Sequence, residues 1–132
     1  MEMRRILLDT NAYSAFKRGD ARIVDHVARA DEILIAVPVL AELRVGFKAG
    51  TMEKRNLDEL EEFLAARRVS VPAITEQTAL FYAEIHSGLK RQGTPLPVND
   101  VWIAACTVES GAILISDDAH FQRIPGLPLN VL

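Results

Sequence analysis

The stretch that decides the fold spans Leu96–Phe121 and reads LPVNDVWIAACTVESGAILISDDAHF. It predicts a helix that opens at Asn99 and Asp100 and is then apolar on nearly every side, which is typical of a helix buried inside a domain. Gly111 favours the end of that helix, and a short β-branched strand over 113–115 follows. The polar residues directly after this strand are Ser116, Asp117 and Asp118. Carboxylates thus stand at both ends of the most buried segment, where each needs a hydrogen bond, an ion pair or a cation.

The composition is that of an ordinary globular protein, with 49% hydrophobic and 25% charged residues among 132. This length predicts a single domain over residues 1–132 with one core. The formal net charge of −3 argues against a passive nucleic-acid binder, which carries an overall basic surface. It does not exclude an enzyme that holds a phosphodiester through metal ions and a local basic strip.

Several features predict a cytoplasmic location. The single cysteine, Cys106, excludes an internal disulfide and stands among apolar neighbours, where we expect it to serve in packing. The apolar run over 6–8 is followed at once by Asp9, so it predicts a first strand rather than a signal peptide. No apolar run approaches the length of a membrane span. We therefore expect no membrane partner.

Strands alternate with helices along the chain, which predicts an α/β fold with a mainly parallel sheet. The expected strands cover residues 6–8, 33–37, 68–71, 113–115 and 129–132. The expected helices cover residues 12–17, 21–30, 38–48, 52–66, 75–91 and the segment from Asn99. We expect Leu80, Ala83 and Leu89 to form the apolar side of the helix over 75–91. The helices over 38–48 and 52–66 predict an antiparallel arm.

Four acidic positions fall on one edge of such a sheet by connectivity alone. In a parallel α/β sheet, the carboxyl ends of the strands and the amino ends of the following helices share an edge, and ligands bind there. Asp9 ends the first strand, Glu42 lies early in the helix after the second strand, and Asp100 opens the central helix. Asp117 and Asp118 end the strand that follows. Because strand side chains alternate, we expect Asp118 to face this edge and Asp117 to face solvent.

Clustered carboxylates repel one another, so without a cation one or more of them would hold a proton at neutral pH. Oxygen ligands suit Mg²⁺ or Mn²⁺, and the sequence lacks the cluster of Cys and His that binds zinc. One or two such ions could activate a water and stabilise the leaving oxygen of a phosphodiester. The helix amino ends near Glu42 and Asp100 would attract an anionic substrate.

Each acid taken alone has a simpler structural explanation. Asp9 suits the cap of the next helix, Glu42 suits a solvated helix surface, and Asp100 suits the first turn of a helix because it complements the dipole. His120 is expected to be structural rather than a general base, and Trp102 is expected to pack rather than to stack on a nucleobase. Arg44 and Lys48 could either contact phosphates or simply be solvated at a helix surface. For Lys90 and Arg91, solvation at a helix end is the better explanation.

Segments spread over nearly the whole chain resemble the PIN-domain ribonucleases, and more closely the VapC-type toxins of bacterial toxin–antitoxin pairs. The matching segments are Leu7–Asn11 (LLDTN), Val37–Glu42 with Arg44 and Gly46, Asn99–Asp100 with Trp102–Ala105 (WIAA), and Ser116–Phe121 (SDDAHF). No single segment is specific, but their combination and order are. The resemblance implies a three-layer PIN-like fold in which helices flank a mainly parallel central sheet.

The same resemblance implies a Mg²⁺- or Mn²⁺-dependent endoribonuclease that hydrolyses RNA phosphodiester bonds. The implied catalytic residues are Asp9, Glu42, Asp100 and Asp118, and the implied metal ligands are Asp9, Asp100 and Asp118. The implied supporting residues are Thr10, Asn11, Asn99 and Ser116, with Thr10 and Asn11 assisting Asp9. The family further implies a homodimer and a cognate antitoxin whose C-terminal segment covers the site, with the arm over 39–66 as the clamp.

Other classes of protein also gather acids at strand ends. A phosphoacceptor receiver domain needs a lysine at the end of a later strand, and none follows the strand over 113–115. A haloacid-dehalogenase-like phosphatase needs a second aspartate two residues after the first, where this chain has Asn11. A catalytically silent PIN-fold module that only binds a partner is the remaining alternative, and the complete set of acids argues against it.

Overall fold

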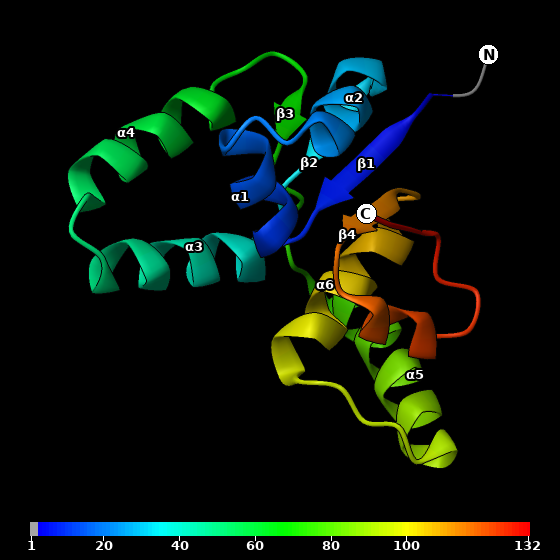
Figure 1. Cartoon of the computed structure of the whole chain (residues 1–132). Helices are drawn as coiled ribbons and strands as arrows, with labels where there is room; N and C mark the ends of the chain where they lie inside the picture. Colours follow the sequence, from blue (N-terminus) through cyan, green and yellow to red (C-terminus); the bar gives the residue numbers. More distant parts are fainter. Residues whose placement is uncertain (1–2) are drawn as a thin grey trace.

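The computed structural model describes residues 3–132, which form an α/β fold around a five-stranded parallel sheet. The strands are β1 Arg5–Leu8, β2 Glu32–Leu34, β3 Val69–Ser70, β4 Ile113–Ser116 and β5 Leu129–Val131. Their order across the sheet is β3-β2-β1-β4-β5, so β1 is central (Figure 1). The register pairs Ile6 with Ile33 on one side and with Ile113 on the other. The predicted α/β class is confirmed.

Six α-helices lie within the described residues, on both sides of the sheet (Figure 1). They are α1 Thr10–Lys17, α2 Ala21–Arg29, α3 Val37–Ala49, α4 Glu53–Leu64, α5 Glu76–Gln92 and α6 Val98–Glu109. A 3₁₀ helix, Ala119–Arg123, follows β4. The side chains of Asp9, Asp20 and Thr75 cap α1, α2 and α5. Each accepts a hydrogen bond from a backbone N–H that the start of a helix leaves unpaired.

The core lies where α6 packs near the two middle strands. Five apolar residues of α6 are almost completely buried: Val101, Ile103, Ala104, Ala105 and Cys106. Residues 6–8 of β1 are also fully buried, as are Leu114 and Ile115 of β4. Each such Leu, Ile or Val side chain contributes about 1.5–3 kcal/mol by leaving water. The apolar central helix therefore occupies the interior position that its composition predicts.

The order of strands reverses between β1 and β4, and this reversal positions the site. The chain builds β1, β2 and β3 toward one edge and then returns through α5 and α6 to add β4 on the other side of β1. Right-handed crossovers place the helices before and after the return on opposite faces of the sheet. Such a reversal opens a crevice at the carboxyl ends of the two strands. Asp9 directly follows β1 here, and Ser116 ends β4.

The second expected strand is shorter than the sequence suggested. It ends at Leu34 because Val37 is already the first residue of α3. Pro38 then occupies the first turn of that helix, where its missing N–H costs no hydrogen bond. Ile35 and Ala36 are completely buried without belonging to a strand, so an apolar run alone could not mark this boundary.

The expected apolar side of α5 is partly wrong. Leu80 is 62% exposed and Ala83 is exposed too, whereas Leu89 is buried as expected. The side of α5 that packs on α6 instead carries Thr78, Tyr82 and Ile85 together with Leu89. These residues follow the same helical period but begin with a threonine. The buried hydroxyl of Thr78 is satisfied by hydrogen bonds, which a hydrophobic pattern does not reveal.

Helices α3 and α4 fold back on each other through residues 50–52 and form an arm beside α1 (Figure 1). This arrangement agrees with the predicted antiparallel pair. Within residues 3–132, no helix combines the length and the apolar character that crossing a membrane requires.

Candidate active site

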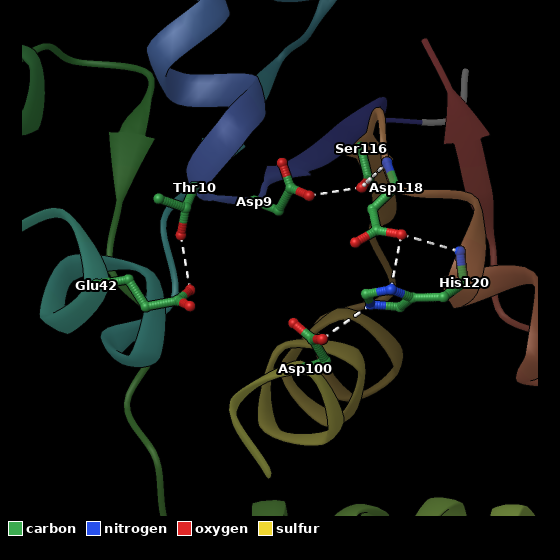
Figure 2. A network of polar contacts seen from close by, with 7 residues as sticks. All are labelled: Asp9, Thr10, Glu42, Asp100, Ser116, Asp118 and His120. Carbon is green, nitrogen blue, oxygen red and sulfur yellow. Dashed lines mark hydrogen bonds and ion pairs between the residues drawn. The ribbon is translucent and has the colours of Figure 1, made fainter. Parts of the chain in front are cut away.

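Four carboxylates line one cavity at the carboxyl edge of the sheet, as the connectivity predicted. The cavity has a volume of about 250 Å³. Its lining residues are Asp9, Thr10, Asn11, Glu42, Asp100, Ile103, Asp118 and Phe121. Figure 2 shows the four acids arranged around a common space, although they come from four separate segments of the chain. We call this space the acid cavity.

Asp9 is the most deeply buried of these acids, with 5% of its surface exposed. One carboxylate oxygen accepts a hydrogen bond from the Ala12 backbone N–H at 2.8 Å, and the other accepts one from the Ser116 hydroxyl at 2.5 Å. Burial nevertheless raises the pKa of Asp9 to about 6, and the charges of Asp117 and Asp100 add to this effect. The two donors fix the orientation of the carboxylate without satisfying its charge.

Ser116 links the first acid to the last. Its buried hydroxyl donates to Asp9 and accepts a hydrogen bond from the Asp118 backbone N–H at 2.9 Å. Asp118 is partly buried and lines the acid cavity, whereas Asp117 is exposed and does not. The predicted alternation between the two adjacent aspartates therefore agrees with the geometry.

His120 lies between two of the acids. Its Nε2 is 2.8 Å from Asp100 Oδ2, and its Nδ1 is 2.7 Å from Asp118 Oδ1 (Figure 2). Burial raises the pKa of Asp100, and the negative charges of Glu42 and Asp118 act in the same direction. The contact with His120 opposes this rise without cancelling it. From the sequence we expected His120 to be structural and did not foresee this bridge. The one available signal was its position two residues after Asp118.

The supporting residues are arranged differently from the expectation. The Thr10 hydroxyl donates to Glu42 at 2.7 Å, so Thr10 orients Glu42 and not Asp9 (Figure 2). Asn11 lines the acid cavity, but its side chain is not hydrogen-bonded to Asp9 in the described part of the chain. Asn99 is exposed and does not line the cavity. Its side chain lies on the outer surface of the first turn of α6, while Asp100 turns inward.

Comparison with known proteins identifies the family. The PIN domain family model matches residues 6–127. The chain belongs to the PIN-domain family. The matched region contains every residue that lines the acid cavity.

Relatives of this PIN domain include proteins named Ribonuclease VapC, which confirms the resemblance to the VapC-type group. The chain is 29% identical to Ribonuclease VapC2 of Rickettsia felis, over 93% of this chain and 94% of that protein. It is 30% identical to Ribonuclease VapC1 of Haemophilus influenzae, over 92% of both.

Solved structures show the same fold. VapBC2 from Rickettsia felis, bound to a DNA fragment from its promoter, has a chain that matches with a TM-score of 0.84 and 26% identity, over 96% of this chain and 98% of that one. VapBC-1 from nontypeable Haemophilus influenzae matches with a TM-score of 0.84 and 28% identity, over 96% and 97%. The PIN-like fold expected from the sequence is confirmed.

The donor set of this PIN domain fits a hard divalent cation, which prefers oxygen ligands. In the described residues no three His, Cys, Asp or Glu side chains are gathered closely enough to enclose an ion. Each carboxylate is instead turned onto a nearby hydrogen-bond donor. Mg²⁺ usually keeps several waters and takes only one or two protein carboxylates, so a closed cage is not required. The unrelieved charge at Asp9 and Asp100 is what a cation would neutralise.

Other residues weighed from the sequence lie outside the acid cavity. Trp102 packs on Tyr82 of α5 with a ring-centroid distance of 4.3 Å, which agrees with a packing role. Lys48 pairs with Glu53 at 3.4 Å rather than facing the acids. Cys106 is buried, and burial raises its thiol pKa to about 11, so it is an inert packing residue.

Proposed function

We propose that this PIN domain is a divalent-metal-dependent endoribonuclease that hydrolyses RNA phosphodiester bonds, and that it acts as the toxin of a toxin–antitoxin pair. The observation that carries the proposal is the convergence of Asp9, Glu42, Asp100 and Asp118 on one cavity. Two of these acids have pKa values raised by burial and by their neighbours. Such a cluster is costly for stability, and a bound Mg²⁺ or Mn²⁺ offsets that cost.

In this proposal Asp9, Asp100 and Asp118 hold the ion, and Glu42 either joins them or orients the attacking water. When bound, the ion supplies a water activated for attack and stabilises the leaving oxygen of the phosphodiester. The protein's own contribution is orientation. Ser116 and the Ala12 N–H hold Asp9, and Thr10 holds Glu42. His120 sets the positions of Asp100 and Asp118.

The relatives support a biological setting for this activity. Those relatives are named ribonucleases, and the solved neighbours are VapBC complexes. We propose that this chain likewise acts on RNA in the cytoplasm, forms a homodimer and is inhibited by a cognate antitoxin. In this proposal the arm of α3 and α4 holds the antitoxin segment, and an antitoxin arginine neutralises the acids. Inhibition that persists after substitution of that arginine would contradict this last point.

The deciding experiment is RNA cleavage by the antitoxin-free protein with Mg²⁺, with Mn²⁺ or with EDTA. We expect cleavage that requires metal and is lost in Asp100→Asn, whose fold is checked by circular dichroism. Cleavage that survives in Asp100→Asn would contradict the role of Asp100, unless it comes from a contaminating nuclease. A wild-type protein that binds metal but cleaves none of a broad set of structured and unstructured RNAs would favour the silent interaction module.

A further inference from the structure

A second cavity lies beside the acid cavity, between α1 and the arm of α3 and α4. It has a volume of about 200 Å³. Its lining residues are Tyr13, Ser14, Lys17, Arg18, Phe47, Asn56 and Glu59. We call it the crook cavity. Its surface is more apolar than polar, and its lining combines the aromatic rings of Tyr13 and Phe47 with the cations Lys17 and Arg18. Neither the packing of the fold nor the acid cavity requires cationic and aromatic side chains to line a cavity at this place.

Helix α1 connects the two cavities. Asn11 lines the acid cavity, whereas Ser14 and Arg18 line the crook cavity. These positions are spaced by three and then four residues, so they lie on one face of the helix. At 1.5 Å per residue the face extends about 10 Å from Asn11 to Arg18. That length matches about three stacked nucleotides at 3.4 Å each.

Helix α3 connects the cavities a second time. Glu42 lines the acid cavity and Phe47 lines the crook cavity. Gly46, one turn after Glu42, has no atom from outside its own stretch of helix within 4 Å of the place where a side chain would begin. A glycine inside a helix costs about 0.5–1 kcal/mol relative to alanine. The open surface over Gly46 therefore leaves space for a ligand that extends from the acids along this helix.

The crook cavity contains hydrogen-bond donors that the protein does not use. Tyr13 is 3% exposed overall, and its hydroxyl, which makes no hydrogen bond within residues 3–132, is open to the solvent of the cavity rather than sealed in the core. Burial and the nearby charge of Glu59 raise its pKa to about 12, so the hydroxyl keeps its proton and remains a donor. Lys17 and Arg18 make no ion pair within the described residues. By contrast, Arg22 of the next helix pairs with Asp20 at 2.8 Å.

We propose that the crook cavity is a subsite for one nucleotide of single-stranded RNA adjacent to the scissile phosphate. The base stacks on Phe47, and its edge meets the Tyr13 hydroxyl and Asn56. The flanking phosphates contact Lys17 and Arg18. Aromatic stacking and cationic phosphate contacts are the usual elements of single-strand binding. This inference rests on the proposed ribonuclease function and deepens it by assigning residues that bind the substrate outside the acid cavity.

Size and charge favour a nucleotide over a protein segment. The volume of about 200 Å³ is smaller than most ligand pockets, which measure about 300–1,000 Å³, and it suits one planar group. Two adjacent cations without acidic partners favour a polyanion. Glu59, the one acid in the lining, is already paired with Arg55 at 3.3 Å, which limits its repulsion of a phosphate.

The test compares two matched double variants, Lys17→Ala/Arg18→Ala and Lys90→Ala/Arg91→Ala. Each removes an adjacent Lys-Arg pair from a helix carboxyl end, and the second pair lies at the end of α5, outside both cavities. Binding is measured by fluorescence anisotropy with a labelled single-stranded RNA of about 12 nucleotides, within the usual range of site sizes. Both variants carry Asp100→Asn so that the probe stays intact, and cleavage is measured without that substitution.

We expect the Lys17/Arg18 variant to bind the probe about tenfold more weakly, with the slope of log affinity against log salt reduced by about 1.4 for two lost phosphate contacts. The Lys90/Arg91 variant should stay within about twofold of its parent. Phe47→Leu should weaken binding about tenfold, and Phe47→Tyr should restore it because a tyrosine ring also stacks. An RNA that carries 4-thiouridine should photocrosslink to peptides containing Tyr13 or Phe47.

Equal binding by both double variants, or crosslinks confined to other peptides, would overturn the subsite and leave the crook cavity to a protein segment such as the antitoxin. If the wild-type protein cleaves RNA while this happens, only the subsite fails. If the probe binds and crosslinks in the crook cavity but the wild-type protein never cleaves it with Mg²⁺ or Mn²⁺, the ribonuclease function fails, and the crook cavity stands only as a binding site for single-stranded RNA. A wild-type protein that binds no RNA would overturn both.

Discussion

The two ends of helix α6 each carry a carboxylate, and they use it differently. At the amino end, Asp100 faces Asp9, Glu42 and Asp118 across the acid cavity. At the carboxyl end, Glu109 accepts a hydrogen bond from the buried Thr78 hydroxyl at 2.6 Å. Thr78 in turn accepts from the Thr75 backbone N–H, which completes the cap of α5.

This comparison shows what distinguishes a candidate site from a structural contact. A threonine hydroxyl donates a hydrogen bond to a carboxylate near each end of α6. Thr10 donates to Glu42 beside the amino end, and Thr78 donates to Glu109 at the carboxyl end. What differs is the number of acids that converge. Glu109 ties the start of α5 to the end of α6, whereas burial raises the pKa of Asp100 and the charges of Glu42 and Asp118 add to that rise. Convergence of charge, rather than any single hydrogen bond, marks the functional end.

The largest expected effect is a difference in RNA cleavage between variants at the two ends of α6. Asp100→Asn should lower RNA cleavage by at least about a hundredfold, because it removes a carboxylate proposed to hold the ion that activates the attacking water. Glu109→Gln, the matched change at the other end of the helix, should leave cleavage unchanged. Single-turnover cleavage with Mn²⁺ measures both. A loss of activity in Glu109→Gln with an intact fold would remove the distinction between the two ends.

The next effect concerns the stability cost of the acid cavity. The pKa of Asp9 is about 6 in the folded protein and 3.8 when unperturbed, so the folded state binds the proton more tightly. The unfolding free energy without metal should therefore be highest below pH of about 4 and should fall as the pH rises through about 6. The loss at neutral pH is of order 3 kcal/mol. Urea unfolding in EDTA at a series of pH values measures it.

The variant Asp9→Asn should lack this decline, so at pH 7 it should be more stable than the wild-type protein while inactive. Mg²⁺ should raise the melting temperature of the wild type more than that of the variant, because the wild type binds the ion more tightly in its folded state. Parallel pH profiles for the two proteins would show that Asp9 does not carry the cost of the cavity.

A smaller effect is expected at His120. His120→Ala removes the ring that bridges Asp100 and Asp118, and residues that orient metal ligands typically contribute about 10–100-fold to metal affinity. We expect Mn²⁺ to bind about tenfold more weakly, as measured by calorimetry. His86→Ala, on the exposed surface of α5, is the control. Unchanged Mn²⁺ affinity in His120→Ala would show that His120 does not position the metal ligands and has only a structural role.

The smallest effect tests the structural end. Thr78→Val leaves the Glu109 carboxylate and the Thr75 N–H without their partner, which should cost about 1–2 kcal/mol of unfolding free energy. Cleavage by the folded variant should not change. Urea unfolding and a cleavage assay on the same preparation check both statements. A drop in cleavage at urea concentrations where the variant is still folded would show that the two ends of α6 are coupled.

Local patterns predicted most of the element sequence and the positions of the acids. Asp9, Asp100 and Asp118 follow from strand and helix boundaries, because parallel connectivity brings those boundaries to one edge. Val37 and Leu80 were assigned wrongly, since an apolar residue near a boundary or on a helix carries no information about which neighbour covers it. The partner of Thr10 was also misjudged, and the bridge made by His120 was not foreseen, because the partner of a polar side chain depends on distances between segments far apart in the chain.

The sequence by itself determined the α/β class, the buried α6 and the set of acids, because hydrophobic period, turn residues and the alternation of strands with helices depend on nearby residues. The tertiary structure decided which donor holds which acid, that His120 bridges two of them, and that Asn99 points away from the cavity. It also decided that the crook cavity opens beside the acids. These outcomes depend on the packing of α1, α3, α6 and the 3₁₀ helix against one sheet, where shifts of about an ångström make or break a hydrogen bond.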